Sequence, residues 1–573
     1  MGDAEGGAVD ARRSNDLNSL LAWRPAELPD SWAPAHGWAS ARVLVLVAIL
    51  VIAAYVALES GAVARRLSAG AARLSRLVLL ALLGLSSLLA VATFLDFGVF
   101  RYGTYLNEWD FYHYYLGTKY APELGYNNLY GATLLADVEG GLRYRNPRGE
   151  FRDLETSRPR SVMTVAAEKH RYRGRFSDAR WRAFVADVGW FKMQLPANRW
   201  SLLLMDHGYN GTPAWSFVIG GLFTRHLSVQ NPVARWLMLL LDPLLLLGTA
   251  AVMTRAFGLR AALLMVMFIG SHYLLSWGHL KGCLLRTDFA MGAVLAICLV
   301  KLGRYRLAGA LLGWAILSRA FPAFLLIGPA LLLGLGFWRT RQLDRRLVGL
   351  FVACGVTIAL VVLGSCAYFG GFAIWREWSQ KIAIHYADGS DWDLGFRTVA
   401  EAVYEQGVPV RLASLELLAG QPVTSAVRPV EIVVLMLLAL PALHFVRTLE
   451  HHEALAYGFV FVFLFSVAGY YYYLFLCVPL VFFAGDLAKP QPALGAAFMF
   501  LTGLLGYVLF SGWEPLRGSW AVFRGWHQTF PTYYYLSCLI GVTVAQMIAL
   551  AGTRARRLER GTTGKPTGGR MGG

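Results

Sequence analysis

The chain lacks the motifs of soluble nucleotide-dependent enzymes and of common hydrolases. It contains no GxxxxGK[ST] phosphate loop, no GxGxxG after a strand, no HExxH and no GxSxG. Charged side chains are also scarce, at 16% of 573 residues. These absences leave no visible pocket for a cytosolic nucleotide. No cleavage site follows a short apolar run near Met1, so we expect no removable signal peptide.

Cysteine is rare and is not spaced for disulfides or a metal site. Six cysteines fall in or beside apolar segments without CxxC spacing, and we expect them to be small buried hydrophobic side chains: Cys283, Cys298, Cys354, Cys366, Cys477 and Cys538. No metal ligand set and no cofactor is predicted.

Apolar residues dominate instead, at 56% of the chain with a mean hydropathy of +0.47. Apolar stretches of about 17–22 residues, long enough to cross a ~30 Å hydrocarbon core, recur along the chain. Only helices suit such stretches, because backbone groups in lipid need partners within the segment. The sequence therefore predicts an all-α polytopic membrane protein with about 12–14 transmembrane helices.

The formal charge of +17 lies in short loops and tails rather than in one basic stripe. Membrane topology explains it better than a nucleic-acid partner does, and none is predicted. The basic loop around residues 65–76 is expected to be cytoplasmic, which places Asp96 and the stretch after it on the opposite side. The 370–427 loop falls on that same side, so the two excursions are expected to meet over one cavity.

The expected organisation has seven parts. They are a disordered polar tail (1–38), first spans with an acidic and aromatic loop (39–130), an extracytoplasmic insert (131–213), a membrane bundle (214–369), an extracytoplasmic loop (370–427), C-terminal spans (428–552) and a basic cytoplasmic tail (553–573). Within the bundle, residues 214–224 are too short for a span and are expected not to cross.

The insert is predicted to hold a hairpin and one amphipathic helix. Polar and apolar residues alternate around Asn146-Pro147, which favours the hairpin. Ser177 is a predicted N-cap for a helix whose apolar positions repeat with helical period. Basic residues flank that apolar face, so we expect the helix to lie on the membrane surface.

The stretch from Asp96 to Tyr130 is the predicted site. It follows an apolar span and combines four carboxylates with eight tyrosines. A short helix is expected over 108–121, with Asn107 as its cap. We favour Asp110 as a general base, because it shares a face with Tyr114 and small residues that leave room for a ligand, and partial desolvation raises a carboxylate pKa. The alternative is that Asp110 only complements the helix dipole.

Other residues of this stretch have either a site role or a structural role. Glu108 is two residues from Asp110, about 200° away on a helix, and so faces elsewhere. The Glu108 and Asp110 pair leaves a divalent cation open as an alternative. Asp96 either lines the site or caps the preceding span. The remaining candidates for lining the site are Tyr115 and Lys119.

These residues resemble a known family. Trp109-Asp110-Phe111, Tyr114-Tyr115, Gly125 and Leu129-Tyr130 are similar to the pattern that opens the first extracytoplasmic loop of glycosyltransferase family 87. Gly278-His279 resembles that family's Gly-Gln-x-Asn stretch and Ser318-Arg319-Ala320-Phe321-Pro322 its Lys-x-x-Pro stretch, while residues 471–480 resemble its late aromatic helix. His279 and Arg319 depart from the family's usual Gln and Lys.

The resemblance implies a C-type (GT-C) glycosyltransferase fold. It also implies transfer of a hexose, mannose by analogy, from a polyprenyl-phosphate donor to a lipid- or glycan-bound hydroxyl. Such a reaction needs a base and a cation that holds the leaving phosphate. Asp110 is then the base and Arg319 the phosphate ligand, with Lys281 and His279 as further phosphate contacts.

Alternatives remain at each position. Arg319 is otherwise a residue that snorkels to the interface, and Lys281 and His279 are otherwise solvated loop residues. Tyr472 and Tyr473 are either site-lining or belt aromatics. The rival functions are a ligase or polymerase of lipid-linked glycans, and a transporter or flippase of lipid or sugar. The expected location is the bacterial inner membrane, with the site on its periplasmic side.

Overall fold

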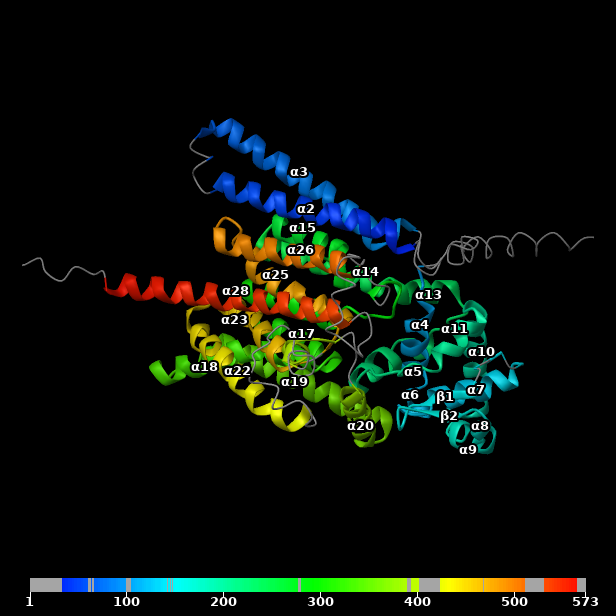
Figure 1. The fold of residues 1–573 in the computed structure, drawn as a ribbon. Helices are drawn as coiled ribbons and strands as arrows, with labels where there is room; N and C mark the ends of the chain where they lie inside the picture. The colour runs from blue at the N-terminus through cyan, green and yellow to red at the C-terminus, as the bar shows by residue number, and fades with distance from the viewer. Residues whose placement is uncertain are drawn as a thin grey trace, which may run out of the picture.

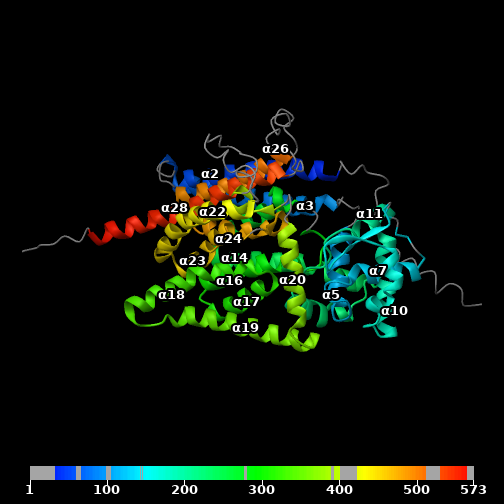
Figure 2. The same ribbon diagram turned by 60° about the horizontal axis from the view of Figure 1, so that its bottom comes forward.

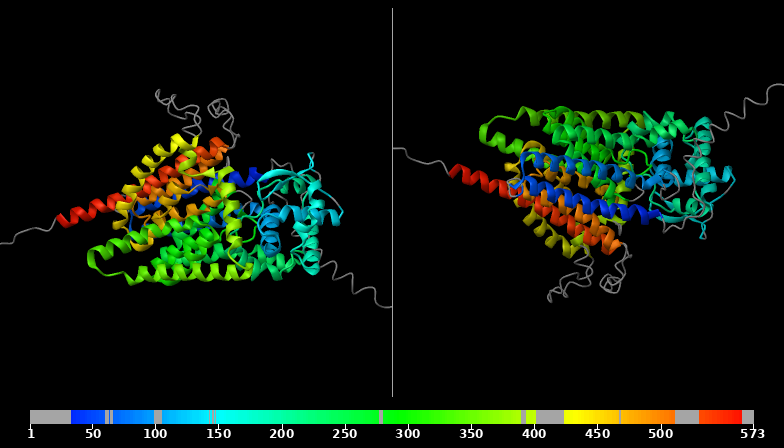
Figure 3. Two further views of the ribbon diagram at one scale, coloured as in Figure 1. Left: turned by 90° about the horizontal axis from the view of Figure 1, so that it is seen from below. Right: turned by 90° about the horizontal axis from the view of Figure 1, so that it is seen from above.

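Long apolar helices lie side by side in the computed structural model, and shorter polar elements gather at one end of them (Figure 1). The structure describes residues 33–59, 63, 66–98, 105–141, 143–144, 146, 148–276, 280–388, 393–400, 423–466, 468–510 and 530–563. We call the long helices the bundle and residues 105–231 the polar excursion. The views in Figures 2 and 3 agree that the excursion projects from one end of the bundle.

The bundle is built of mostly apolar helices. They are α2 (Ala33–Glu59), α3 (Ala69–Phe94), α13 (Pro232–Leu239), α14 (Leu241–Phe257), α15 (Leu259–Ser271), α16 (Asp288–Lys301), α17 (Tyr305–Ser318), α18 (Ile327–Thr340), α19 (Arg345–Phe369), α22 (Val423–Phe445), α23 (His451–Tyr457), α24 (Phe459–Phe465), α25 (Cys477–Ala484), α26 (Pro490–Phe510) and α28 (Phe530–Thr563).

Seven helical stretches in the described part of the chain are long and apolar enough to cross a membrane. They are Ala39–Glu59, Ala69–Phe94, Pro232–Phe257, Phe321–Thr340, Arg345–Phe369, Pro490–Leu509 and Thr532–Thr553. The all-helical membrane architecture is therefore confirmed at this level. A total of about 12–14 spans stays a prediction, because the other apolar helices of the bundle are shorter.

Two glycines let bundle helices approach closely. A Cβ at Gly270 of α15 would lie 2.2 Å from the Ala90 carbonyl oxygen of α3, and one at Gly309 of α17 would lie 2.1 Å from the Leu350 carbonyl oxygen of α19. Small residues at such crossings permit backbone contact, which is how helices pack where lipid supplies no hydrophobic driving force.

The excursion has its own apolar core, separate from that of the bundle. Its elements are α4 (Glu108–Phe111), a π-helical turn (Tyr112–Leu116), α5 (Gly117–Lys119), α6 (Ala121–Leu124), α7 (Leu129–Glu139), β1 (Glu150–Asp153), β2 (Arg158–Ser161), α8 (Met163–Ala167), α9 (Lys169–Arg173), α10 (Asp178–Gln194), α11 (Ala197–Leu203), α12 (Pro213–Trp215) and a second π-helical turn (Ser216–Gly221). The last two are too short to cross a membrane, as predicted for residues 214–224.

The predicted hairpin forms a few residues later than expected. β1 and β2 pair antiparallel, from Glu150 with Ser161 to Asp153 with Arg158. The turn therefore lies at residues 154–157 and not at Asn146-Pro147. The sequence pattern identified the hairpin, but several polar residues near it were equally suited to the turn.

Helix α10 confirms the predicted cap and contradicts the predicted surface location. Ser177 Oγ accepts a hydrogen bond from Arg180 N at 3.3 Å. The apolar residues Trp181, Phe184 and Phe191 are buried, but they pack in the core of the excursion. The amphipathic face thus covers other protein segments rather than a membrane surface, because the tyrosine-rich stretch supplies an apolar partner that the helix pattern alone does not reveal.

The described part of the 370–427 loop contacts the polar excursion, as predicted, through α20 (Ala373–Asp388). Glu377 Oε1 accepts a hydrogen bond from Tyr126 N at 2.7 Å, and Lys381 Nζ donates to the Tyr126 carbonyl oxygen at 3.0 Å. Trp378 Nε1 donates to the Asn210 carbonyl oxygen at 3.3 Å. A two-residue strand, β3 (Asp393–Leu394), then pairs with β4 (Ala468–Gly469).

Both chain ends differ from the predicted tails where the structure describes them. Helix α2 begins at Ala33, inside the predicted 1–38 tail, and residues 1–32 lie outside the described part. Helix α28 continues to Thr563, inside the predicted 553–573 tail. All six cysteines are free thiols; four are buried as predicted, whereas Cys366 and Cys538 are only partly buried.

Candidate functional site

Asp110 lies in α4, where the excursion meets the bundle, and is 6% exposed. Asn107 caps this helix as predicted, because its Oδ1 accepts a hydrogen bond from Asp110 N at 3.1 Å. Asn107 N in turn donates to the Gly282 carbonyl oxygen at 3.0 Å. The start of α4 is thereby attached to the loop that precedes α16, and that loop carries the second charged residue of the site.

Arg286 is this second residue. Its Nε lies 3.4 Å from Asp110 Oδ1, and its guanidinium carbon lies 3.9 Å from the centre of the Tyr114 ring. Asp242 holds the loop in place, because its carboxylate accepts from Arg286 N at 2.8 Å, Thr287 N at 2.9 Å and Thr287 Oγ1 at 2.6 Å. The backbone of Arg286 is thus fixed while its side chain reaches Asp110.

Arg319 approaches the same ring from the end of α17. Its Nη2 donates to the Tyr114 hydroxyl oxygen at 3.1 Å, and its Nη1 donates to the Ser318 carbonyl oxygen at 2.7 Å. The Tyr114 hydroxyl donates to Asn210 Oδ1 at 2.6 Å. Tyr472 lies under the Arg319 guanidinium, at 5.3 Å from the ring centre. Tyr114 therefore contacts both guanidinium groups, and Arg286 connects it to Asp110. We call Asp110, Tyr114, Arg286 and Arg319 the open cluster.

The π-helical turn explains how Tyr114 reaches this position. The turn follows α4 directly, so the side chains after Asp110 depart from α-helical spacing. The predicted face of small residues does not leave room for a ligand, because Tyr209 fills it: a Cβ on Gly117 would lie 2.4 Å from Tyr209 Cγ. That part of the prediction is wrong.

Each charged member of the open cluster leaves a buried polar atom without a nitrogen or oxygen partner among the described residues. These atoms are Asp110 Oδ2, Arg286 Nη1 and Arg319 Nε. An unpaired buried polar atom costs about 1–3 kcal/mol, so three in one cluster call for an explanation. A polar ligand that offers both donor and acceptor atoms would satisfy all three.

The donors left open in the cluster both belong to guanidinium groups, which suits a ligand with acceptor oxygens. Arg286 lies beside Asp110, and Arg319 interacts electrostatically with the buried Asp288, so two carboxylates balance two guanidinium groups. The nearby Asp288 is already enclosed, since it accepts from Ser318 Oγ at 2.8 Å and from the indole nitrogens of Trp215 and Trp314 at 3.1 Å.

Burial also sets the protonation state of Tyr114. It raises the pKa of the Tyr114 hydroxyl, and the two guanidinium groups only partly offset the effect. The hydroxyl therefore stays protonated at neutral pH and can act as a hydrogen-bond donor. The Tyr114 side chain therefore adds no charge to the open cluster.

The predicted residues divide into those that join the cluster and those that do not. Tyr114, Arg319 and Tyr472 lie with Asp110 as described, and Glu108 is buried in the same first turn of α4. Lys281, in the loop that leads to Arg286, places its Nζ 2.8 Å from Oδ1 of Asp96, which lies just after α3. His279 lies outside the described residues.

Three predicted site residues have other partners. Lys119 Nζ lies 2.8 Å from Asp187 Oδ2 and 2.6 Å from the Tyr115 hydroxyl oxygen, both within the core of the excursion. Tyr473 is buried in the bundle core, and its hydroxyl lies beside Gly395. Lys119, Tyr115 and Tyr473 therefore belong to structural contacts, because their neighbours in space come from segments that sequence spacing does not reveal.

Arg286, Asn210, Asp242 and Asp288 were missed by the sequence reasoning. Three of them are charged residues at the ends of apolar helices, and such residues are costly in a membrane unless they are paired or functional. That signal was present in the run Arg286-Thr287-Asp288. Asn210 offered no comparable signal, since an isolated asparagine in a loop is common.

The fold and the open cluster define a helical membrane protein with a buried, charged site at the junction of its bundle and its excursion. No protein-family model, curated protein or solved structure matches the chain. In the part of the chain that the structure describes, no group of three or more His, Cys, Asp or Glu side chains is placed to hold a metal ion.

Proposed function

We propose that this protein is a membrane glycosyltransferase of C type that transfers a hexose, mannose by analogy with glycosyltransferase family 87, from a polyprenyl-phosphate donor to a hydroxyl on a lipid- or glycan-bound acceptor. Asp110 is the general base. Arg319 and Arg286 bind the phosphate of the donor, and Tyr114 positions both guanidinium groups.

The reaction is a direct inverting displacement. The acceptor oxygen forms a bond to the anomeric carbon while the bond from that carbon to the phosphate oxygen breaks. Asp110 takes the acceptor proton, and the polyprenyl phosphate leaves with the bonding electron pair. Negative charge grows on the leaving phosphate, so fixed guanidinium groups stabilise the transition state more than the ground state.

The observation that carries this proposal is the set of unpaired buried atoms in the open cluster. Asp110 Oδ2 can accept the proton of a hydroxyl, and Arg286 Nη1 and Arg319 Nε can donate to phosphate oxygens. A base and a phosphate-binding pair around one aromatic ring are the two parts that this chemistry needs.

The charge distribution supports an extracytoplasmic site. The end of α18, which contains Arg339, and the turn after it, which contains Arg341, lie at the end of the bundle opposite the excursion, as does the C-terminal part of α28 (Figures 1 and 2). By the positive-inside rule this end is cytoplasmic, so the open cluster faces the periplasm of a bacterial inner membrane.

The test is to supply purified protein in lipid nanodiscs with polyprenyl-phosphate mannose, labelled in the sugar, and a mixture of lipid and glycan acceptors. Transfer of label to an acceptor, with release of polyprenyl phosphate, is the expected result. Reaction only with a larger lipid-linked glycan would instead identify a ligase or polymerase. Movement of intact donor across a vesicle membrane without bond cleavage would contradict the proposal and identify a transporter.

A further inference from the structure

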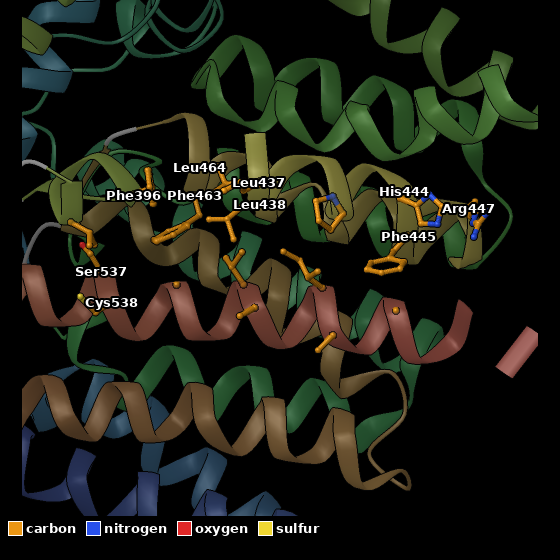
Figure 4. Close-up of a pocket in the computed structure, with 18 residues that line it drawn as sticks. Phe396, Leu437, Leu438, His444, Phe445, Arg447, Phe463, Leu464, Ser537 and Cys538 are labelled. Carbon is orange, nitrogen blue, oxygen red and sulfur yellow. The ribbon is translucent and has the colours of Figure 1, made fainter. Parts of the chain in front are cut away.

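A second site lies within the bundle, away from the open cluster. A cavity of about 680 Å³ runs between α22, α24 and α28, and we call it the lateral groove (Figure 4). Most of its lining is apolar, including Leu437, Leu438, Phe463 and Leu464. Its volume is in the range of sites that bind small molecules.

The polar side chains that line the groove stand at its two ends. Ser537 and Cys538 lie at one end, and His444 and Arg447 lie at the other (Figure 4). Among the described residues that line the middle of the groove, no polar side chain is present to hold ordered water, which needs two to four polar partners. An apolar chain is therefore the chemistry that fits the middle, and a polar or charged group fits the end at Arg447.

The groove faces the lipid side of the bundle. On α22, Leu437 is 66% exposed and Leu440 is 58% exposed. The opposite wall is α28, whose stretch Thr532–Thr553 is long and apolar enough to cross a membrane. From Ser537 to Gly552 the α-helical rise gives the groove a length of roughly 22 Å. This exceeds the ~15 Å half-thickness of the hydrocarbon core, so one extended acyl chain fits along it.

Arg447 lies where this apolar stretch ends. Thr448 Oγ1, on the next residue, donates to the Ala551 carbonyl oxygen of α28 at 3.2 Å. A cation at the membrane interface, at the mouth of an apolar groove, is complementary to an anionic headgroup above an acyl chain. We propose that the lateral groove binds an anionic phospholipid, with one acyl chain along α28 and its phosphate at Arg447 and His444.

Two substitutions separate the parts of this site. Arg447→Gln removes the headgroup contact, and Arg339→Gln, at an exposed position in the last turn of α18, is its control. Gly541→Leu fills the groove: a Cβ there meets the Phe463 ring at 3.4 Å, so the rest of the side chain extends along the cavity wall. Gly355→Leu, whose Cβ meets nothing within 4 Å, is the matched control.

The experiment is native mass spectrometry of the delipidated full chain, titrated with phosphatidylglycerol or with phosphatidylcholine. We expect one tightly held phosphatidylglycerol, about fivefold weaker binding in Arg447→Gln, loss of the tight site in Gly541→Leu and no change in either control. If Gly541→Leu fails to fold, Ala545→Leu blocks the same groove.

Three results would overturn the inference. They are equal affinity for the two lipids in the unmodified protein, unchanged binding in Arg447→Gln, and a protein dimer that forms in place of lipid binding and is lost in Gly541→Leu. None of these readouts depends on glycosyl transfer, so the lateral groove and the proposed activity fail or succeed separately.

Discussion

The stretch from residue 105 to 130 contributes to two buried polar clusters that differ in how completely their polar atoms are paired. One is the open cluster, and the other, formed by Lys119, Tyr115, Tyr120 and Asp187, we call the closed cluster. In the closed cluster, Asp187 Oδ2 accepts from Lys119 Nζ at 2.8 Å and from the Tyr115 and Tyr120 hydroxyls at 3.2 and 2.8 Å. Lys119 Nζ also donates to the Leu227 carbonyl oxygen. In the open cluster around Tyr114, each charged residue keeps an atom without such a partner. Completed networks stabilise a fold, whereas incomplete ones indicate a place for a ligand.

The largest expected effect of a substitution falls on the closed cluster. Lys119→Met should lower the free energy of unfolding by about 3–5 kcal/mol, because it leaves the Asp187 charge buried without its cation. Thermal and denaturant unfolding of the purified chain would measure this, with Lys169→Met at an exposed position as the control. The double variant Lys119→Met/Asp187→Leu should recover much of the loss. A Lys119→Met protein as stable as the unmodified one would remove the distinction between the clusters.

The next effect falls on the open cluster and should appear in activity instead of stability. Arg319→Gln should lower the rate of glycosyl transfer about 100-fold, as expected for loss of one donor to a developing negative charge. The melting temperature should fall less than in Lys119→Met, since the buried Asp288, which interacts with Arg319, keeps its hydrogen bonds from Ser318, Trp215 and Trp314.

Arg182→Gln, at an exposed position on α10, is the control for Arg319→Gln and should keep full activity. A large loss of stability in Arg319→Gln, with unchanged turnover of the remaining folded protein, would reassign Arg319 to a structural role.

A smaller effect tests the packing between the two clusters. Gly117→Ala should destabilise the protein by about 1–3 kcal/mol, because the added methyl group overlaps the Tyr209 ring. Gly189→Ala on α10 is the matched control, since a Cβ there meets nothing within 4 Å. The control should be slightly stabilising, as alanine is favoured over glycine within a helix. Equal stability of the two variants would show that the Gly117 face has room after all.

The last prediction is a shallow pH dependence of the free energy of unfolding, which arises at the contact between α20 and the polar excursion. Burial lowers the pKa of Lys381 to about 7, below its unfolded value of about 10.4. Between these values the unfolded chain binds a proton that the folded chain does not, so stability should rise with pH above about 7 and be constant below it, by at most about 1.4 kcal/mol per pH unit.

Melting curves between about pH 6 and 9 would show this slope for Lys381, and Lys381→Met should flatten it. A slope that persists in Lys381→Met would assign it to other groups.

The sequence predicts the bundle well because its signals are local. The bounds of the apolar stretches depend on residues adjacent in the chain, and the caps at Asn107 and Ser177 depend on one side chain and the next turn. The apolar helices as such and both caps are confirmed in the structure.

The site was predicted less completely, because its geometry depends on contacts between distant segments. The π-helical turn after Asp110 and the Tyr209 ring against Gly117 cannot be read from helical period. Arg286 reaches Asp110 only because Asp242 holds its loop, across more than forty residues of chain. Lys119 and Tyr115 lie within ten residues of Asp110, yet both contact Asp187 in the core of the excursion, a partner that is distant in the sequence.

Glycosyl transfer by Asp110→Asn is the most direct test of the open cluster as a catalytic site. The amide keeps the shape of the side chain and cannot take the acceptor proton, so transfer should fall at least about 100-fold. Binding of the polyprenyl-phosphate donor, held by Arg286 and Arg319, should change by only a few-fold in the same protein. Full transfer activity in Asp110→Asn, with labelled donor and acceptor both supplied, would contradict the role of Asp110 as the base.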